Sequence, residues 1–261
     1  MKVIVAGYGP VGRAVEYVLR KRGNLEVFVD DPLKDFEYDI ATLRTNSSYE
    51  EPDAVVVCVA TPMRENGSCE TGNVRDVFDK YGPGPKYLIK SAVDPLFLDD
   101  MSILYDLTVS PEFLGSSNIN RDTQEEFEYQ TYAIYGGESP RFWDELFKPV
   151  LPALHTVKYC TLQQAAFAKY VENTFLATKV AFFNEMYRIY QDIGFEGFDQ
   201  MVDAITIDPR IGRSHTQVPG PDGKFGYGGH CLPKDMAALR FIAPKSPLLD
   251  AVTDVNEEHR K

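Results

Sequence analysis

Short apolar runs rich in valine and isoleucine recur along the N-terminal part of the chain, and helix-compatible segments separate several of them. These runs cover residues 3–6, 25–29, 54–60 and 87–89. Such alternation is typical of right-handed β-α-β units, in which parallel strands form one sheet and helices cover its faces. The sequence therefore predicts an α/β fold that begins with a Rossmann-type, mainly parallel sheet.

The sheet domain is expected to end where the alternating pattern ends. Two later β-like runs, residues 131–135 and 155–160, flank a helical segment over residues 140–149. The chain has 261 residues, which is enough for one or two domains at about 150 residues each. We therefore predict an NAD-binding Rossmann domain over residues 1–161.

A long helical pattern follows this first domain. It runs from residue 162 to residue 193 and is ended by Gly194, because glycine commonly terminates helices. A loop rich in proline and glycine over residues 209–229 then separates shorter helical segments. We expect residues 162–261 to form a small helical domain that begins with this long connecting helix.

The charge balance argues against a nucleic acid as a partner. Lysine and arginine number 27 against 39 acidic residues, so the formal net charge is −12, and no basic block stands out. Binding to a phosphate backbone would require the opposite sign of charge. A small anionic ligand remains possible, because a glycine-rich loop or a helix N-terminus can bind it locally.

The sequence also predicts the compartment, and it predicts no metal site. The N-terminus has no signal-peptide pattern, and no run approaches the roughly 20 apolar residues of a membrane helix, so we expect a cytoplasmic protein. The four cysteines show no C-x-x-C spacing, which disfavours a zinc site or a disulfide scaffold. Cys58, within AVVVCVA, fits a small buried apolar residue.

A glycine motif follows the first predicted strand and opens a helix. Gly7, Gly9 and Gly12 belong to the hexapeptide GYGPVG, which also contains Tyr8, Pro10 and Val11. Glycines at this spacing permit a tight turn, a close backbone approach to a pyrophosphate, and close packing of helix on strand. The motif therefore predicts a dinucleotide site at the start of the chain.

An acidic residue favours NAD over NADP at this site. Asp30 ends the second predicted strand, where a carboxylate accepts hydrogen bonds from the adenosine ribose and repels a 2′-phosphate. Lys34 lies close by in the sequence, and its positive charge makes the preference for NAD over NADP weaker. The predicted cofactor is NAD.

Cys231 is the strongest candidate for chemistry in the second half of the chain. It lies in GYGGHCLPKD, just before Pro233, which suits the first turn of a helix, and close to Lys234. A helix N-terminus and a nearby cation stabilise a thiolate, so the sequence predicts a nucleophilic cysteine.

Polar residues on the long helix and after one strand are further candidates. Lys169 and Asn173 lie four residues apart and share a helix face, and Asn184 extends that stripe about three turns later. Glu112, in SPEFLGSSN, follows a strand-like run, and ligands of open α/β sheets bind beyond such strand ends. A solvated helix edge and a surface glutamate are the simpler interpretations of these patterns.

The chain resembles the UDP-glucose/GDP-mannose dehydrogenase family of nucleotide-sugar dehydrogenases along nearly its whole length. The motifs occur in the family's order: GYGPVG, VATPMRENG, SPEFL, FAKYVENTFLATKVAFFNE, DPRIG and PGPDGKFGYGGHCLPKD. The last two are highly specific. The resemblance implies a four-electron oxidation of a sugar alcohol to a carboxylate by two NAD in succession, with UDP-glucose as the expected substrate. GDP-mannose and UDP-N-acetylhexosamines are open alternatives.

The resemblance also implies a role for each matching residue. Cys231 would form the thiohemiacetal and thioester, Lys169 and Asn173 would stabilise oxyanions, Asp235 would position water, and Glu112 would be the base for hydrolysis. The implied cofactor contacts include Thr61, Ser91 and Lys234. The implied substrate contacts are Glu112, Phe113, Leu114, Lys169, Asn173, Arg210, Phe225, Gly226, Tyr227, Gly228 and Gly229.

The sequence departs from the family at several places. Ala92 stands where relatives have a threonine that helps to place water, Ser116 replaces a second acid, and His215 lies near a position often held by tyrosine. The chain also stops in the helix that leads, in relatives, to a second α/β domain holding much of the nucleotide. Exposed apolar residues on that helix predict pairing, either as a homodimer through the central helices or with a companion chain.

Two other functions are compatible with these residues. A single-hydride dehydrogenase of the β-hydroxyacid type would use a similar Rossmann domain and a helical Lys–Asn pair but would not need Cys231. A shortened NAD-binding subunit, weakly active or non-catalytic, would need a partner chain for the nucleotide sugar. Ala92 favours the second alternative, whereas the complete set of Cys231, Lys169, Asn173 and Asp235 argues against it.

Overall fold

A seven-stranded sheet forms the N-terminal part of the protein. The computed structural model describes residues 1–32, 51–114 and 122–261. The strand order is β2-β1-β3-β4-β5-β6-β7. The strands are β1 (Lys2–Ala6), β2 (Glu26–Asp30), β3 (Ala54–Val57), β4 (Lys86–Ile89), β5 (Asp106–Val109), β6 (Tyr132–Gly137) and β7 (Thr156–Cys160).

The sheet is parallel except at one junction. Strands β1 to β5 are parallel, β6 runs antiparallel to β5, and β7 is parallel to β6. The carboxyl ends of β1 to β5 therefore meet at one edge, where ligands of open α/β sheets bind. The predicted α/β class with a mainly parallel Rossmann-type sheet is confirmed.

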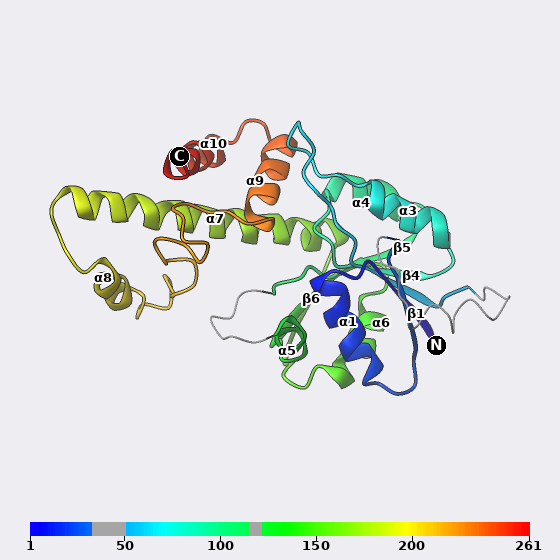
Figure 1. Ribbon diagram of the computed structural model, residues 1–261. Helices are drawn as coiled ribbons and strands as arrows, with labels where there is room; N and C mark the ends of the chain where they lie inside the picture. The colour runs from blue at the N-terminus through cyan, green and yellow to red at the C-terminus, as the bar shows by residue number, and fades with distance from the viewer. Residues whose placement is uncertain (33–50, 115–121) are drawn as a thin grey trace. The chain divides into compact units, whose positions relative to one another are not determined.

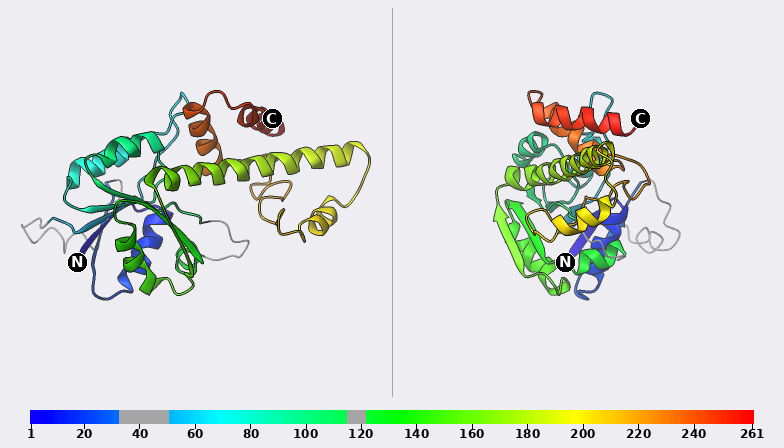
Figure 2. Two further views of the ribbon diagram at one scale, coloured as in Figure 1. Left: turned by 180° about the vertical axis from the view of Figure 1, so that it is seen from behind. Right: turned by 90° about the vertical axis from the view of Figure 1, so that its left-hand side faces the viewer.

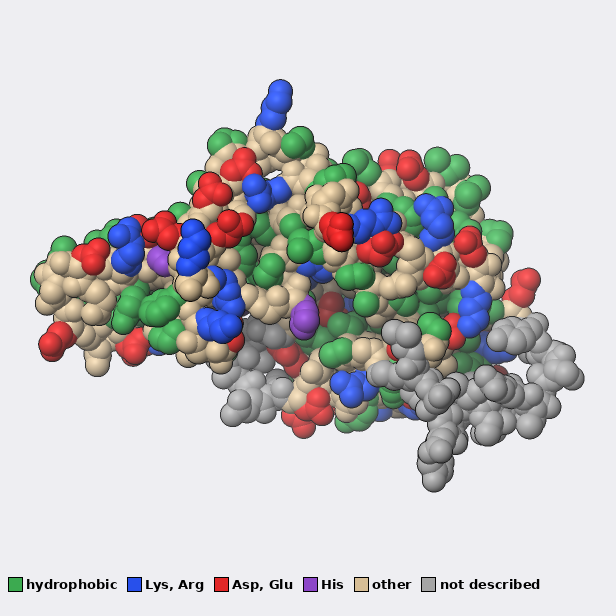
Figure 3. All heavy atoms as spheres, turned by 45° about the horizontal axis from the view of Figure 1, so that its top comes forward, with side chains coloured by type: hydrophobic (Ala, Val, Ile, Leu, Met, Phe, Trp, Pro, Cys, Tyr) green, Lys and Arg blue, Asp and Glu red, His purple; other side chains and the backbone are tan. Residues whose placement is uncertain are grey.

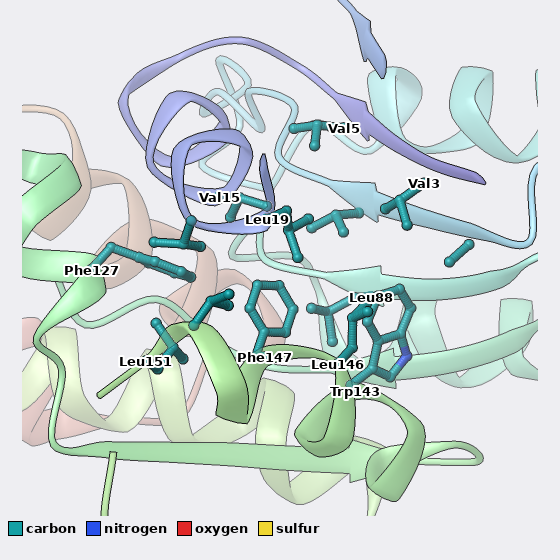
Figure 4. Packing of buried hydrophobic residues seen from close by; sticks show 14 of the residues in the cluster. Val3, Val5, Val15, Leu19, Leu88, Phe127, Trp143, Leu146, Phe147 and Leu151 are labelled. Carbon is teal, nitrogen blue, oxygen red and sulfur yellow. The ribbon is translucent and has the colours of Figure 1, made fainter. Parts of the chain in front are cut away.

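Helices cover both faces of this sheet (Figure 1). One face packs against α1 (Pro10–Arg20), α5 (Thr123–Glu128) and α6 (Pro140–Phe147), which is followed by the 3₁₀ helix η1 (Lys148–Val150). The other face packs against α3 (Gly72–Tyr81) and α4 (Pro95–Ser102). Figure 4 shows Val3 and Val5 of β1 and Leu19 of α1 in one core with the rings of Trp143 and Phe147. Two layers of buried apolar side chains, one on each face, thus hold the sheet.

The chain divides into two compact units. The first contains residues 1–61 and 70–169, and the second contains residues 62–69 and 170–261. A domain division at residue 161 stays a prediction.

One long helix, α7 (Leu162–Asp192), begins in the first unit and continues through the second. It has 31 residues and is continuous in both views of Figure 2. In the second unit α7 is joined by α8 (Phe198–Ile205), α9 (Cys231–Ile242) and α10 (Pro247–His259). Small residues Ala177 and Ala181 of α7 pack against Tyr227, Met236 of α9 and Val252 of α10. The expected long helix followed by shorter helices is confirmed.

A short segment after β3 belongs to the second unit. Residues 62–69 are closed by a bridge between Met63 and Cys69 and by a hydrogen bond from the Arg64 amide to the Ser68 carbonyl (2.9 Å). Cys69 packs in an apolar cluster with Tyr170, Ala238 and Leu239. The chain therefore passes from one unit to the other three times.

The surface in Figure 3 mixes acidic and basic side chains and shows no extended basic area on that face. None of the described helices is long and apolar enough to cross a membrane.

Candidate functional site

The glycine motif forms the turn between β1 and α1. Gly7 has φ +92°, and a Cβ there would lie 2.7 Å from the backbone of Cys58. A Cβ on Gly12 would lie 2.0 Å from the carbonyl oxygen of Gly7. Both positions therefore require glycine, because the backbone allows no side chain there.

Gly9 has a different environment. It precedes α1, whose first residue is Pro10, and a Cβ on Gly9 would meet no atom within 4 Å. Open space at an uncapped helix N-terminus is the arrangement that a pyrophosphate requires. The geometry of the turn therefore fits a dinucleotide.

The carboxylates of Asp30, at the end of β2, and Asp31, just after it, are already hydrogen-bonded. Asp30 accepts from Lys80 Nζ at 2.8 Å (Oδ1) and 2.7 Å (Oδ2), and from the Tyr81 hydroxyl at 2.8 Å. Asp31 Oδ2 accepts from the Tyr8 amide at 2.7 Å. A carboxylate offers about four lone-pair sites, so Asp30 retains acceptor capacity for a ribose. Lys34 lies outside the described residues.

Two predicted cofactor residues connect the loops beyond β3 and β4. Thr61 Oγ1 donates to the carbonyl of Ala92 at 2.8 Å, and Ser91 Oγ donates to the carbonyl of Val59 at 2.7 Å. Both hydroxyls therefore fix the backbone at the carboxyl edge of the sheet. Ala92 contributes to this arrangement through its carbonyl, which an alanine supplies as well as a threonine.

Glu112 lies beyond β5 and is almost fully buried. Its Oε1 accepts from the Phe113 amide at 2.9 Å, and its Oε2 lies 3.5 Å from Nζ of Lys90. Lys169, at the end of the first unit, lies over the Phe113 ring with its Nζ 5.0 Å from the ring centroid. The structure thus brings Glu112, Phe113 and Lys169 together, and it adds Lys90, which our sequence analysis missed.

Cys231 is the first residue of α9, and Pro233 lies in the first turn. The sequence predicted a helical segment from residue 233, and the helix begins two residues earlier. Cys231 is exposed, whereas Cys69 is buried. Burial raises the pKa of Cys58 to about 12 and also raises the pKa of Cys160. Of the four cysteines, only Cys231 has an exposed side chain, so its thiol is the most accessible to a ligand.

One turn into α9, Asp235 is only 1% exposed and is held from two sides. Asn173 Nδ2 of α7 donates to Oδ2 at 2.5 Å, and Lys234 Nζ donates to Oδ1 at 2.5 Å. This network joins three of the predicted residues and orients the Asp235 carboxylate. Lys234 is paired with Asp235 here, while its predicted cofactor contact is not tested.

The predicted sugar loop, residues 225–229, is held by side chains of α7 and α10. Asn184 Oδ1 accepts from the Gly226 amide at 2.9 Å, and Asn256 Oδ1 accepts from the Tyr227 amide at 2.6 Å. Arg260 Nη1 donates to the carbonyls of Phe225 (3.2 Å) and Gly226 (3.3 Å). A Cβ on Gly228 would meet the Arg260 guanidinium at 2.6 Å. The helical spacing predicted Asn184 near the site, whereas no sequence pattern marked Asn256 or Arg260.

The remaining predicted residues lie elsewhere. Arg210 is highly exposed, and its guanidinium is bonded to Asp208 at 2.6 Å. Leu114 packs against the core of the first unit, and Ser116 lies outside the described residues. No group of three or more His, Cys, Asp or Glu side chains suited to a metal ion occurs within residues 1–32, 51–114 and 122–261.

Comparison with known proteins identifies the helical part of the chain. The family model for the UDP-glucose/GDP-mannose dehydrogenase family, central domain, matches residues 163–258. These residues belong to the UDP-glucose/GDP-mannose dehydrogenase family. The match covers most of α7, the loop before Cys231, and nearly all of α10, so the resemblance seen in the sequence is confirmed.

Relatives within the UDP-glucose/GDP-mannose dehydrogenase family are longer proteins. UDP-glucose 6-dehydrogenase of Rickettsia bellii is 30% identical over 231 residues, which cover 82% of this chain and 51% of that protein. The chain thus spans about half the length of the first curated relatives it matches.

Solved structures support the fold. A UDP-glucose dehydrogenase from Pyrobaculum islandicum gives a TM-score of 0.77 at 22% identity, covering 98% of this chain and 68% of that one. A 3-hydroxyisobutyrate dehydrogenase from Mycobacterium tuberculosis gives a TM-score of 0.66 at 17% identity, covering 99% and 94%. These similarities indicate a shared fold of a Rossmann domain followed by helices.

Proposed function

We propose that this protein oxidises the primary alcohol of a nucleotide sugar, with UDP-glucose as the first candidate, to a carboxylate in two NAD-dependent steps. Alcohol, water and two NAD⁺ give a carboxylate, two NADH and three protons, so four electrons leave the sugar. The family of the central domain supports a dehydrogenase, and Cys231 supports a route through a thioester.

The observation that carries this proposal is the start of α9. Cys231 is exposed at the first position of a helix, and one turn later the buried Asp235 is oriented by Asn173 and Lys234. A helix N-terminus stabilises a negatively charged sulfur, and a fixed carboxylate can orient water. A single hydride transfer requires neither a thiol nor a hydrolytic water.

The proposed steps assign one task to each side chain. After the first oxidation, the Cys231 thiolate bonds to the aldehyde carbon and gives a thiohemiacetal, which the second oxidation converts to a thioester. Lys169 and Asn173 stabilise negative charge on the sugar oxygen during these steps. Glu112 takes a proton from the water that cleaves the thioester, and Cys231 leaves as a thiolate.

The open turn at Gly9 supports NAD as the cofactor. Gly7, Gly9 and Gly12 would hold the pyrophosphate at the start of α1, and Asp30 would accept hydrogen bonds from the ribose. NAD, when bound, accepts a hydride in each oxidation. The ion pair between Asp30 and Lys80 reduces the negative charge at the ribose, so discrimination against NADP is expected to be moderate.

An apolar stripe on α7 supports pairing with a second copy. Six exposed side chains recur along α7 and just beyond its end at spacings of four or seven residues, which places them on one helix face. These residues are Phe167, Val171, Phe175, Phe182, Ile189 and Ile193. A stripe of this kind is self-complementary across a two-fold axis, as a homodimer requires.

The direct test is NADH formation from NAD and UDP-glucose by the purified protein, with Cys231→Ser beside it. Two NADH per sugar in the wild type, with the variant stopped before hydrolysis, is the expected result. GDP-mannose and UDP-N-acetylhexosamines follow if UDP-glucose gives no signal. NAD binding without turnover on any sugar would instead indicate a non-catalytic subunit that needs a partner chain.

A further inference from the structure

A buried lysine that the proposed reaction does not use lies beside Glu112. Lys90 directly follows β4, and its side chain is only 4% exposed. Burial of an ammonium group is strongly unfavourable unless an anion and hydrogen-bond acceptors compensate for the lost water. The groups around Nζ of Lys90 therefore indicate which anion and which acceptors compensate for its buried charge.

Three side chains approach the Lys90 ammonium group. Ser110 Oγ lies 3.2 Å from Nζ, Glu112 Oε2 lies 3.5 Å away, and the Phe127 ring centroid lies 5.1 Å away. Ser110 and Phe127 are neutral. Of these three, Glu112 supplies the negative charge.

Glu112 uses its two oxygens differently. Oε1 accepts a hydrogen bond from the Phe113 amide, whereas Oε2 is buried, has no hydrogen-bond partner among the described residues, and faces Lys90. The titratable neighbours Cys58 and Tyr135 both have a pKa raised mainly by burial, so they remain neutral near pH 7. Lys90 is therefore the charged group that balances Glu112.

We propose that Lys90 is a positioning residue for Glu112, which fixes the orientation of its carboxylate through the buried ion pair at Oε2. The inference rests on the proposed function, in which Glu112 is the base for thioester hydrolysis. In that step the water oxygen bonds to the thioester carbon and one water proton passes to the Glu112 carboxylate. The carbon–sulfur bond breaks, Cys231 leaves as a thiolate, and the product acid loses its second proton to solvent.

A second lysine on the same strand provides a matched control. Lys86 begins β4 and pairs with Asp106 of β5 at 2.6 Å, but their side chains are 38% and 28% exposed. The two pairs thus join the same two strand regions and differ in burial. A solvated pair contributes little to stability, whereas breaking a buried pair leaves an uncompensated charge.

The first experiment measures unfolding in denaturant and needs no activity. Lys90→Met and Glu112→Gln are each expected to raise the unfolding equilibrium constant by about a hundredfold or more, and the double variant should recover most of that loss. The corresponding cycle of Lys86→Met and Asp106→Asn should change it by less than about tenfold. Purely additive losses at Lys90 and Glu112 would overturn the proposal.

The second experiment distinguishes a positioning role from a structural one. With NAD and UDP-glucose, Lys90→Met is expected to give a burst of NADH and then a sugar adduct on Cys231, detected by intact-protein mass. Lys90→Arg keeps the charge and should restore turnover in part, and Lys86→Met should match the wild type. Normal hydrolysis by Lys90→Met would contradict the proposal. Absence of turnover in the wild type would contradict the proposed function. The unfolding measurements on the Lys90 and Glu112 variants would still show whether these two residues are coupled.

Discussion

The four cysteines differ in how readily their thiols can react. Cys231 is exposed, Cys69 is buried, and burial raises the pKa of both Cys58 and Cys160. With its pKa raised to about 12, the Cys58 thiol stays protonated at pH 8. Only the thiolate is a strong nucleophile, so the environment selects one cysteine for chemistry.

This selection predicts the order of alkylation in the folded protein. At pH 8 iodoacetamide should modify Cys231 first, and peptide mass spectrometry should find Cys58 and Cys69 unmodified until the protein unfolds. Cys231→Ser should lose the fast phase and keep the rest. A fast phase at Cys58 would contradict the environment described for that thiol.

His215 predicts a loss of stability in mild acid. Its backbone has φ +61°, and burial, followed by the charge of Lys179, lowers its pKa, while Glu172 acts in the opposite direction. The unfolded chain therefore binds a proton near the ordinary value of about 6.5, where the folded protein still resists it. The contribution of this group to stability is present above that pH and is lost as the pH falls.

We expect His215→Asn to reduce this acid sensitivity. Asparagine tolerates a positive φ and does not titrate, so the slope of unfolding free energy against pH below about 6.5 should be smaller than in the wild type. Thermal or denaturant unfolding between pH 5 and 8 measures it. An unchanged slope would show that other groups cause the acid effect.

Candidate residues could be picked out from the sequence where a motif marked them, but not where their burial is what sets them apart. The glycines at 7, 9 and 12 and the cysteine at 231 were found from spacing and context. Lys90 in YLIKSAV has no pattern that separates a buried lysine from a solvated one. Its position directly after a largely buried strand was the available signal, because ligands of open α/β sheets bind beyond the carboxyl ends of the strands.

At the level of elements, α10 supports the loop before Cys231. Asn256 exchanges hydrogen bonds with both backbone groups of Tyr227, at 2.6 Å and 3.2 Å, and is itself buried. A buried amide that loses its acceptor costs about 1–3 kcal/mol. The conformation of residues 225–229 therefore depends on a helix that begins more than fifteen residues later in the sequence.

Asn256→Ala should loosen this loop. We expect the Tyr227 amide to lose protection in hydrogen exchange and the protein to lose about 1–3 kcal/mol of stability. Glu257→Ala, at an exposed position on the same helix, is the matched control. Equal protection of Tyr227 in the two variants would show that Arg260 and Asn184 suffice to hold the loop.

The apolar stripe of α7 predicts the oligomeric state. Phe175, at 63% exposure, lies near the middle of the stripe, and a glutamate there would place a charge in an apolar interface. We expect Phe175→Glu to be monomeric in sedimentation at concentrations where the wild type is dimeric. Gln191→Glu, at an exposed position on the same helix, should remain dimeric, and a monomeric wild type would contradict the proposed pairing.

The spacing of apolar residues predicted most helices and strands. Where each of them begins and ends depends on contacts that this spacing does not reveal. The strand expected over residues 54–60 ends at Val57, after which the Cys58 amide still donates to the Ala6 carbonyl at 2.7 Å. Helix α9 starts at Cys231 after His230, which provides no side-chain cap, so no capping pattern marked its beginning. The helix α5 is only six residues long and has too few turns to show a period.

At the level of the whole molecule, segment 62–69 connects the two units in sequence. Cys69 is buried because Tyr170, Ala238 and Leu239, all in the second unit, cover it. The first unit therefore carries a segment whose packing partners lie later in the chain. A fragment that ends at residue 169 would lack them.

This arrangement predicts the behaviour of such a fragment. Cys69 should resist iodoacetamide in the full chain and react rapidly in a fragment of residues 1–169, as peptide mass spectrometry can measure. Cys58, which is partly buried and packs against the core of the first unit, should stay protected in both and serves as the internal control. Slow reaction of Cys69 in the fragment would mean that other residues of the first unit cover it.

The three crossings between the units also restrict how the gene could be recombined. A chimera joined once, at residue 169, would combine the sheet of one parent with helices that must accept a foreign segment at residues 62–69. Exchange of this segment together with the helices needs three junctions. Designed hybrids of this fold should therefore take residues 62–69 from the same parent as residues 170–261.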